Sequence, residues 1–145
     1  MKLPEYVTVK EVGRVCKELK IRDWSKLKET KIPPKEARTI LKEVNVKGMK
    51  ISIDDFCAGL EVELEHGRRF RDANVTNNHP VLTGKIVLAH LKESLDYYKR
   101  LEVAELEGDL LKALIAKNPA KLGSKFKKLI EARRILSQSE SGQLK

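Results

Sequence analysis

Apolar residues recur at helical spacing along most of the chain. Between Thr8 and Lys20, valines, a cysteine and a leucine return every three or four residues, which is typical of an amphipathic helix. Thr8 is expected to cap this helix, because Glu11 stands three residues later and completes a capping box. Trp24 follows the helix and is expected to be a core anchor. The pair Pro33-Pro34 predicts a break and then a helix through Val44.

The second half of the chain continues the same helical pattern. A helix is expected from a cap at Ser52 or Asp54 to His66, with Gly67 as its C-terminal stop and a loop over residues 68–80. From about Val81 a long helix follows, with a kink allowed near Ser94 to Asp96. The dipeptide Asn118-Pro119 ends this run. A last helix capped by Ser124 is expected, followed by a frayed segment over residues 137–145.

Composition supports an all-helical fold. The 145 residues are rich in Leu, Ile, Val, Ala, Lys and Glu, whereas aromatic residues make up only 5% and there are only eight glycines. The prediction is an all-α, compact multi-helix bundle with a basic helical C-terminal extension. The expected boundaries are a helical core domain over residues 1–116 and a basic C-terminal helix with a frayed tail over residues 117–145.

Two histidine and glutamate pairs are the strongest candidates for chemistry. In Glu63-x-x-His66 and His90-x-x-Glu93, the spacing of three residues puts both side chains on one helix face. If the two helices face each other, the four side chains form a mixed imidazole and carboxylate site suited to one divalent Zn, Fe or Mn ion. Tyr97 is expected to support this site through a hydrogen bond.

A purely structural reading of the same four residues is also open. Each imidazole would then hydrogen-bond a carboxylate and lock two helices together. His79, in the loop before Pro80, is expected to be a surface or turn residue, although it could add a ligand. No known catalytic motif is present, so the prediction is an uncharacterised helical protein that leans away from enzymes. A Cys/His nucleophile is the weakest reading, because Cys57 lies on an apolar arc away from His66.

Charge suggests a second kind of function. The net charge is +9, and residues 117–145 hold eight basic and two acidic residues, which give +6 of it. The alternative function is therefore a basic module for nucleic acid or an acidic protein partner, with the His/Glu cluster purely structural. A solvated helix face is the plain alternative. The residues expected to contact a polyanion are Lys121, Lys125, Lys127, Lys128, Arg133 and Arg134.

Two cysteines, Cys16 and Cys57, are expected to be reduced and buried. The chain shows no signal-peptide pattern and no apolar run of membrane-spanning length, so no membrane association and a cytoplasmic location are expected.

Residues 8 to 107 resemble a family of small uncharacterised bacterial, archaeal and viral proteins of unknown function. The motifs that carry the resemblance are Val12-Gly13-Arg14, Asp23-Trp24-Ser25-Lys26, GLEVELEHG over 59–67, Asn74-Val75-Thr76, PVLTGKIVLAHLKE over 80–93, Asp96-Tyr97-Tyr98 and Arg100-Leu101. The chain departs from the family in a helix inserted around Thr30 to Lys50, in Leu95 where proline is usual, and in Asn77-Asn78-His79 where acidic residues are common. The resemblance implies a fold and candidate positions but no reaction.

Overall fold

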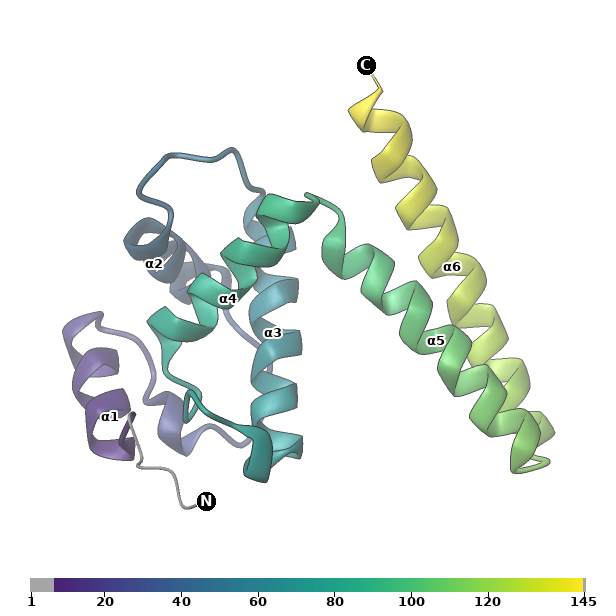
Figure 1. Ribbon diagram of the computed structural model, residues 1–145, viewed down its shortest axis with the longest axis horizontal. Helices are drawn as coiled ribbons and strands as arrows, with labels where there is room; N and C mark the ends of the chain where they lie inside the picture. The colour runs from purple at the N-terminus through teal and green to yellow at the C-terminus, as the bar shows by residue number, and fades with distance from the viewer. Residues whose placement is uncertain (1–6, 145) are drawn as a thin grey trace. The chain divides into compact units, whose positions relative to one another are not determined.

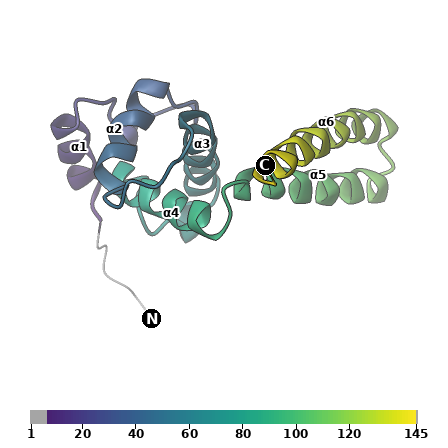
Figure 2. The same ribbon diagram turned by 90° about the horizontal axis from the view of Figure 1, so that it is seen from above.

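The chain forms two separate groups of helices. The computed structural model describes residues 7–144, and within them six α-helices and two short 3₁₀ turns account for the regular structure (Figures 1 and 2). The first unit ends at Leu95 and the second begins at Asp96. The all-α prediction is confirmed for this part of the chain. The division differs from the boundary at 116/117 expected from the sequence, because the helix before that point pairs with the basic helix after it.

The first unit holds four helices. Their bounds, with those of the two 3₁₀ turns, are α1 Val9–Glu18, η1 Trp24–Lys26, α2 Pro34–Val44, α3 Ile53–Arg69, η2 Arg71–Ala73 and α4 Pro80–Glu93. The starts of these helices follow from local chemistry. The Thr8 side chain accepts a hydrogen bond from the Glu11 amide, and the Ser52 side chain accepts one from the Asp55 amide at 3.0 Å. Both expected caps are confirmed.

Helices α2, α3 and α4 pack against one another, and α1 adds to them through α4. Their shared core consists of large apolar side chains that are almost fully buried, among them Trp24, Ile40, Phe56, Leu60, Leu64, Val87 and Leu91. The approach of α4 to α2 requires glycine at position 84. A Cβ atom there would lie 2.6 Å from Cγ2 of Ile40, so any larger residue would push the two helices apart.

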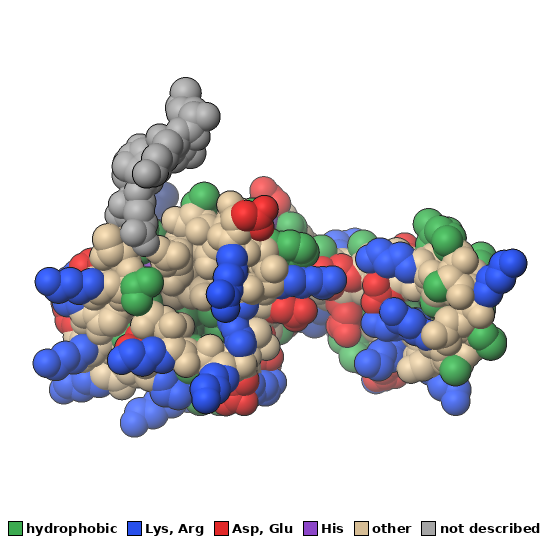
Figure 3. All heavy atoms as spheres, turned by 90° about the horizontal axis from the view of Figure 1, so that it is seen from below, with side chains coloured by type: hydrophobic (Ala, Val, Ile, Leu, Met, Phe, Trp, Pro, Cys, Tyr) green, Lys and Arg blue, Asp and Glu red, His purple; other side chains and the backbone are tan. Residues whose placement is uncertain are grey.

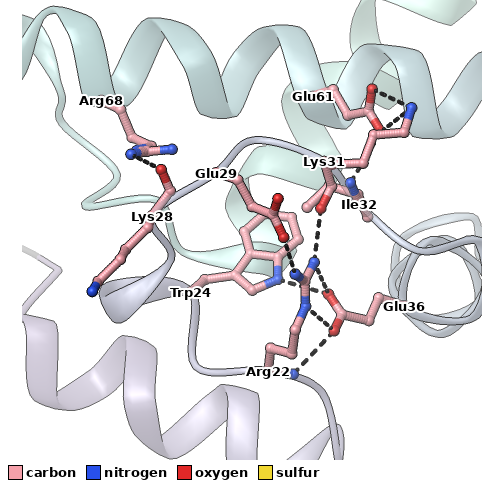
Figure 4. Close-up of polar contacts among 9 residues, drawn as sticks. All are labelled: Arg22, Trp24, Lys28, Glu29, Lys31, Ile32, Glu36, Glu61 and Arg68. Atoms are coloured by element: carbon pink, nitrogen blue, oxygen red, sulfur yellow. Dashed lines mark hydrogen bonds and ion pairs between the residues drawn. The ribbon is translucent and has the colours of Figure 1, made fainter.

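A buried carboxylate fastens the connection between α1 and α2 (Figure 4). Glu36 accepts a 2.7 Å hydrogen bond from Nε of Arg22 and a 3.2 Å hydrogen bond from the Trp24 indole. The bond to Glu36 raises the pKa of Arg22, which keeps the guanidinium charged. Glu61 on α3 fixes the same connection further along by accepting from the Ile32 amide. Trp24 is thus the core anchor that the sequence predicts, held by a carboxylate that periodicity does not reveal.

Helix α3 is longer than expected. The sequence predicts its end at Gly67, but the helix continues to Arg69 and Phe70 is its C-cap. Gly67 serves a packing purpose instead: a Cβ atom at this position would clash with the side chains of Asn74 and Asn78. The missing side chain therefore lets the following loop fold back onto the end of α3.

The second unit is a hairpin of two helices, α5 Tyr97–Ile115 and α6 Pro119–Gln143. Its small core consists of Leu106, Leu129 and Ala132, with Val103 and Leu110 packed against it. The kink allowed near Ser94 to Asp96 is a full interruption, since α4 ends at Glu93 and Ser94 has extended backbone angles.

The start and end of the last helix differ from expectation. Asn118 caps α6 by accepting from the Lys121 amide at 2.9 Å, so the helix begins before the expected cap at Ser124. It also continues to Gln143, where the sequence predicts a frayed segment. Arg100 binds Glu140 at 2.8 Å and Gln143 donates to Asp96, and these two contacts tie the end of α6 to the start of α5. Among the described residues, no helix combines the length and the apolar character that crossing a membrane requires.

Candidate functional site

The structure brings together one residue from each predicted pair. Glu63 lies on α3 and His90 on α4, and Oε1 of Glu63 is 3.7 Å from Nε2 of His90. The side chains are 17% and 30% exposed, so each is mostly withdrawn from water. Helices α3 and α4 pack directly against each other, which explains why residues 27 positions apart meet.

The other two members of the predicted cluster are placed differently. His66 is one turn after Glu63 on α3, whereas Glu93 is exposed in the last turn of α4. Within residues 7–144, no group of three or more His, Cys, Asp or Glu side chains is arranged so that it could hold a metal ion. The four-residue site is therefore not assembled in this structure, and its centre is the Glu63 and His90 pair.

A hollow of about 340 Å³ opens beside this pair. Its wall combines the end of α3, the loop after it and the start of α4. Polar lining comes from Glu63, His66, Asn74, Thr76 and the buried Thr83, and apolar lining comes from Phe70, Val75 and Ile86. The volume and the mixed lining suit a small molecule that presents both polar and apolar groups.

The asparagine-rich loop over residues 74–78 forms one side of the hollow. The Asn74 side chain donates to the Gly67 carbonyl at 2.8 Å and to the Asn78 side chain at 3.0 Å. Asn77 and Asn78 both have positive φ, which asparagine tolerates better than most residues. A second hollow of about 380 Å³ lies against the same loop, with Arg68, Arg71 and Ser25 in its wall. Sequence analysis predicts only a loop here, although a run of asparagines is typical of a turn stabilised by side-chain hydrogen bonds.

His79 has a structural role that the sequence does not reveal. It lies in the loop before Pro80, as expected, but it is buried, and its Nδ1 accepts the Leu82 amide at 3.3 Å as the cap of α4. Burial lowers the pKa of His79, and the negative charge of the nearby Glu11 opposes this effect. The imidazole is thus held in the neutral form that can accept at Nδ1.

Tyr97 does not lie on the same helix as His90. It is the first residue of α5 in the second unit, and its ring contacts that of Tyr98 with centroids 5.2 Å apart. The expected support from Tyr97 assumed that the helix from about Val81 continues past Tyr97, but the chain breaks after Glu93.

Both cysteines are free thiols. Cys16 is buried and its sulfur accepts the Trp24 amide at 3.4 Å, whereas Cys57 is partly exposed. Burial raises the pKa of both thiols, which disfavours the reactive thiolate. This electrostatic setting gives no support to a cysteine nucleophile.

The six predicted polyanion contacts do not share one face of α6. Lys125 pairs with Asp109, Arg133 pairs with Glu107 at 2.6 Å, and Arg134 pairs with Glu131 at 2.6 Å. At 100° per residue, Lys121 and Lys128 project on a different side of the helix from Lys127. Half of the expected positive surface is thus neutralised within the hairpin, and the rest is spread around the helix.

The comparisons with known proteins identify a family without supplying an activity. No curated protein matches the chain, and no solved structure matches it. A family model described as "Protein of unknown function (DUF5661)" matches residues 12–107, which is more than half of the sequence. The matched region contains Glu63, His66, His90 and Glu93, and it ends within α5. The chain therefore belongs to the DUF5661 family of proteins of unknown function.

Proposed function

We propose that the first unit binds one divalent metal ion between α3 and α4, with Glu63 and His90 as primary ligands and His66 as the third. The observation that carries this proposal is the 3.7 Å separation of Glu63 Oε1 and His90 Nε2. This distance is longer than a hydrogen bond, which spans about 2.7 to 3.2 Å. Two ligand atoms that each lie about 2.0 to 2.1 Å from one ion can be up to about 4.2 Å apart, so a shared ion fits between them.

His66 supports the proposal by its position. It shares a helix face with Glu63 and lines the same hollow, so rotation of its side chain on metal binding supplies the third ligand. Mixed nitrogen and oxygen ligation suits Zn²⁺, Fe²⁺ or Mn²⁺. With three protein ligands, the ion keeps an open position toward the 340 Å³ hollow, where a small molecule or water can bind. Glu93 is not among the proposed ligands, because its side chain is exposed.

The test is a Zn²⁺ and Mn²⁺ titration of the full chain, purified without a metal-affinity step, followed by calorimetry and by elemental analysis. Glu63→Gln and His90→Gln are expected to weaken binding about tenfold or more, since each removes a direct ligand. His66→Gln is expected to weaken it as well. Glu93→Gln and Glu65→Gln are matched controls, since each removes one exposed carboxylate from the same two helices, and both should bind as the original chain does.

The competing interpretation is a polar clamp between α3 and α4. In that case Glu63→Gln and His90→Gln would lower the free energy of unfolding to the same extent with and without added metal. Retention of full metal affinity in these two variants, or the absence of stoichiometric binding in the original chain, would exclude the metal site.

A further inference from the structure

The tip of the α5–α6 hairpin carries an apolar groove. We call this surface the tip groove; its volume is about 490 Å³, and it is lined by Leu110, Leu111, Leu114, Pro119, Leu122, Gly123 and Phe126. Every lining residue is apolar or glycine. The groove adjoins the hairpin core of Leu106, Leu129 and Ala132 through Leu110, which packs against that core. It thus represents apolar surface that the fold of the hairpin leaves in water.

The exposure of these side chains is contiguous. Leu111, Leu114 and Phe126 are 59%, 61% and 54% exposed, and Ile130, one turn beyond Phe126, is 51% exposed. Single exposed leucines are ordinary on protein surfaces, whereas a large contiguous apolar patch marks an interaction site. Figure 3 shows hydrophobic side chains gathered among Lys and Arg side chains on the hairpin.

The groove has a defined end. At 100° per residue, Glu107 lies beside Leu111 on α5, and Arg133 lies in line with Phe126 on α6. These two side chains form an ion pair at 2.6 Å across the hairpin. The groove therefore lies between the turn at Lys117 and this ion pair. From Pro119 to Phe126 it follows α6 for about two turns, so a short helix can lie along it.

The charged residues around the groove are almost all positive. Residues 110–130 contain six lysines and no acidic residue. Lys112 and Lys125 share one acidic partner, Asp109, which lies just outside this range. One carboxylate offsets only one of the six positive charges, so the tip keeps a strongly positive potential. Lys127 borders the groove directly, because its helix neighbour four residues earlier is Gly123, a lining residue. An occupant of this groove thus meets an apolar floor with a positive rim.

We propose that the tip groove binds an acidic amphipathic helix of a partner protein. A helix laid between α5 and α6 would bury its apolar stripe on the leucines and Phe126 and complete a three-helix bundle. Its acidic residues would face the lysines of the rim. A second copy of the hairpin fits less well because two tips with six lysines each repel one another. Nucleic acid satisfies the positive rim but offers nothing to the apolar floor, and a membrane surface does not enter a channel between two helices.

This proposal is independent of the metal site, because its observations come only from the second unit. Its direct test uses the full chain and a fluorescein-labelled synthetic amphipathic helix of about four turns. The probe carries leucines at i, i+3, i+4 and i+7 spacing and glutamates elsewhere. A matched probe carries lysines in place of the glutamates. Fluorescence anisotropy is expected to show saturable binding of the acidic probe and at least tenfold weaker binding of the basic one.

Variants locate the binding site on the hairpin. Leu114→Ser and Phe126→Ser are expected to weaken binding of the acidic probe at least tenfold, and circular dichroism should show unchanged helix content because both side chains are exposed. Ile135→Ser is the control for an exposed apolar residue outside the groove. Lys127→Glu and Lys128→Glu change the net charge equally, but only Lys127 borders the groove. The Lys127 variant is therefore expected to lose several times more affinity.

Four results would overturn the proposal. The first is equal binding of the acidic and basic probes, and the second is unchanged binding by Leu114→Ser and Phe126→Ser. The third is a concentration-dependent dimer in sedimentation that Phe126→Ser abolishes, since a second copy would then fill the groove. The fourth is a Phe126-dependent affinity for anionic phosphatidylserine vesicles or for duplex DNA that exceeds the affinity for the acidic probe.

Discussion

His79 shows how one buried side chain makes the stability of the fold depend on pH. Its Nδ1 caps α4 by accepting the Leu82 amide, and burial lowers its pKa below the ordinary value of 6.5. In the unfolded chain the imidazole takes up a proton as the pH falls through about 6.5, whereas in the folded chain it does so only at lower pH. The unfolded state binds more protons in this window, so the free energy of unfolding decreases as the pH falls.

We expect urea denaturation to show this loss as the pH falls below about 6.5, where the unfolded chain begins to take up the proton before the folded chain does. His79→Asn keeps a capping side chain but cannot titrate, so its stability should vary less over the same window. Carboxylates such as Glu11 and Asp23, whose pKa values are lowered by hydrogen bonds, titrate at lower pH and do not interfere. An unchanged pH dependence in the variant would show that another group is responsible.

The roles of residues that depend on tertiary contacts could not be predicted from the sequence. In the sequence, Glu36 is one charged residue on a predicted helix. Only the folded structure places Arg22 and the Trp24 indole against it. His79 precedes a proline in a polar loop, which says nothing of its burial. The approach of Glu63 to His90, in contrast, was predictable, because the three-residue spacing in each pair puts its side chains on one helix face, and two such faces can meet. The sequence could not exclude Glu93, since its exposure follows from the end of α4.

At the scale of helices, the starts were easier to predict than the ends. Thr8, Ser52 and Pro34 begin helices through local chemistry that the sequence displays. The break between α4 and α5 was only allowed for, because the apolar period continues in phase on both sides of Ser94 to Asp96. Glycine is a common helix stop, but Gly67 does not end α3. The close approach of Asn74 and Asn78 explains why this position is glycine. Periodicity therefore predicts helical segments, whereas their length depends on packing.

Two helix ends provide a test of backbone strain. Helices α1 and α5 end with lysines at positive φ, Lys20 at 55° and Lys117 at 49°. At each end the residue after the lysine donates back to a carbonyl five residues earlier, Ile21 to Cys16 and Asn118 to Ala113, both at 3.0 Å. This hydrogen-bond pattern is the Schellman motif, in which glycine is the preferred residue at the left-handed position.

Lys20→Gly and Lys117→Gly are each expected to raise the free energy of unfolding by about 0.5 to 1 kcal/mol. Relief of the left-handed conformation is worth about 1 to 2 kcal/mol, and the greater freedom of glycine in the unfolded chain offsets part of it. Trp24, the single tryptophan, reports on the first unit. Lys20→Gly should therefore shift the fluorescence transition, and Lys117→Gly should shift only circular dichroism. Lys20→Ala and Lys117→Ala retain the strain, and stabilisation by these variants would contradict the explanation.

At the scale of the whole molecule, the two units have cores of very different size. The first unit buries large side chains from four helices, whereas the hairpin core rests on Leu106, Leu129 and Ala132. Helices with little tertiary burial are marginally stable, so the amides of α5 and α6 should exchange with deuterium faster than those of α2, α3 and α4. Hydrogen exchange followed by mass spectrometry measures this difference in the full chain.

The same measurement separates the two proposed binding sites, because a ligand stabilises the unit that holds it. At a free concentration 100 times its Kd, a ligand adds about 2.7 kcal/mol to the opening free energy of that unit. Zn²⁺ is therefore expected to slow exchange in α3 and α4 around Glu63 and His90, and the acidic helical probe to slow it in α5 and α6. Each ligand should leave the other unit unchanged, since the two sets of contacts share no residue. Slower exchange throughout the chain with either ligand would mean that the two units open together, and slower exchange in the wrong unit would contradict the site assigned to that ligand.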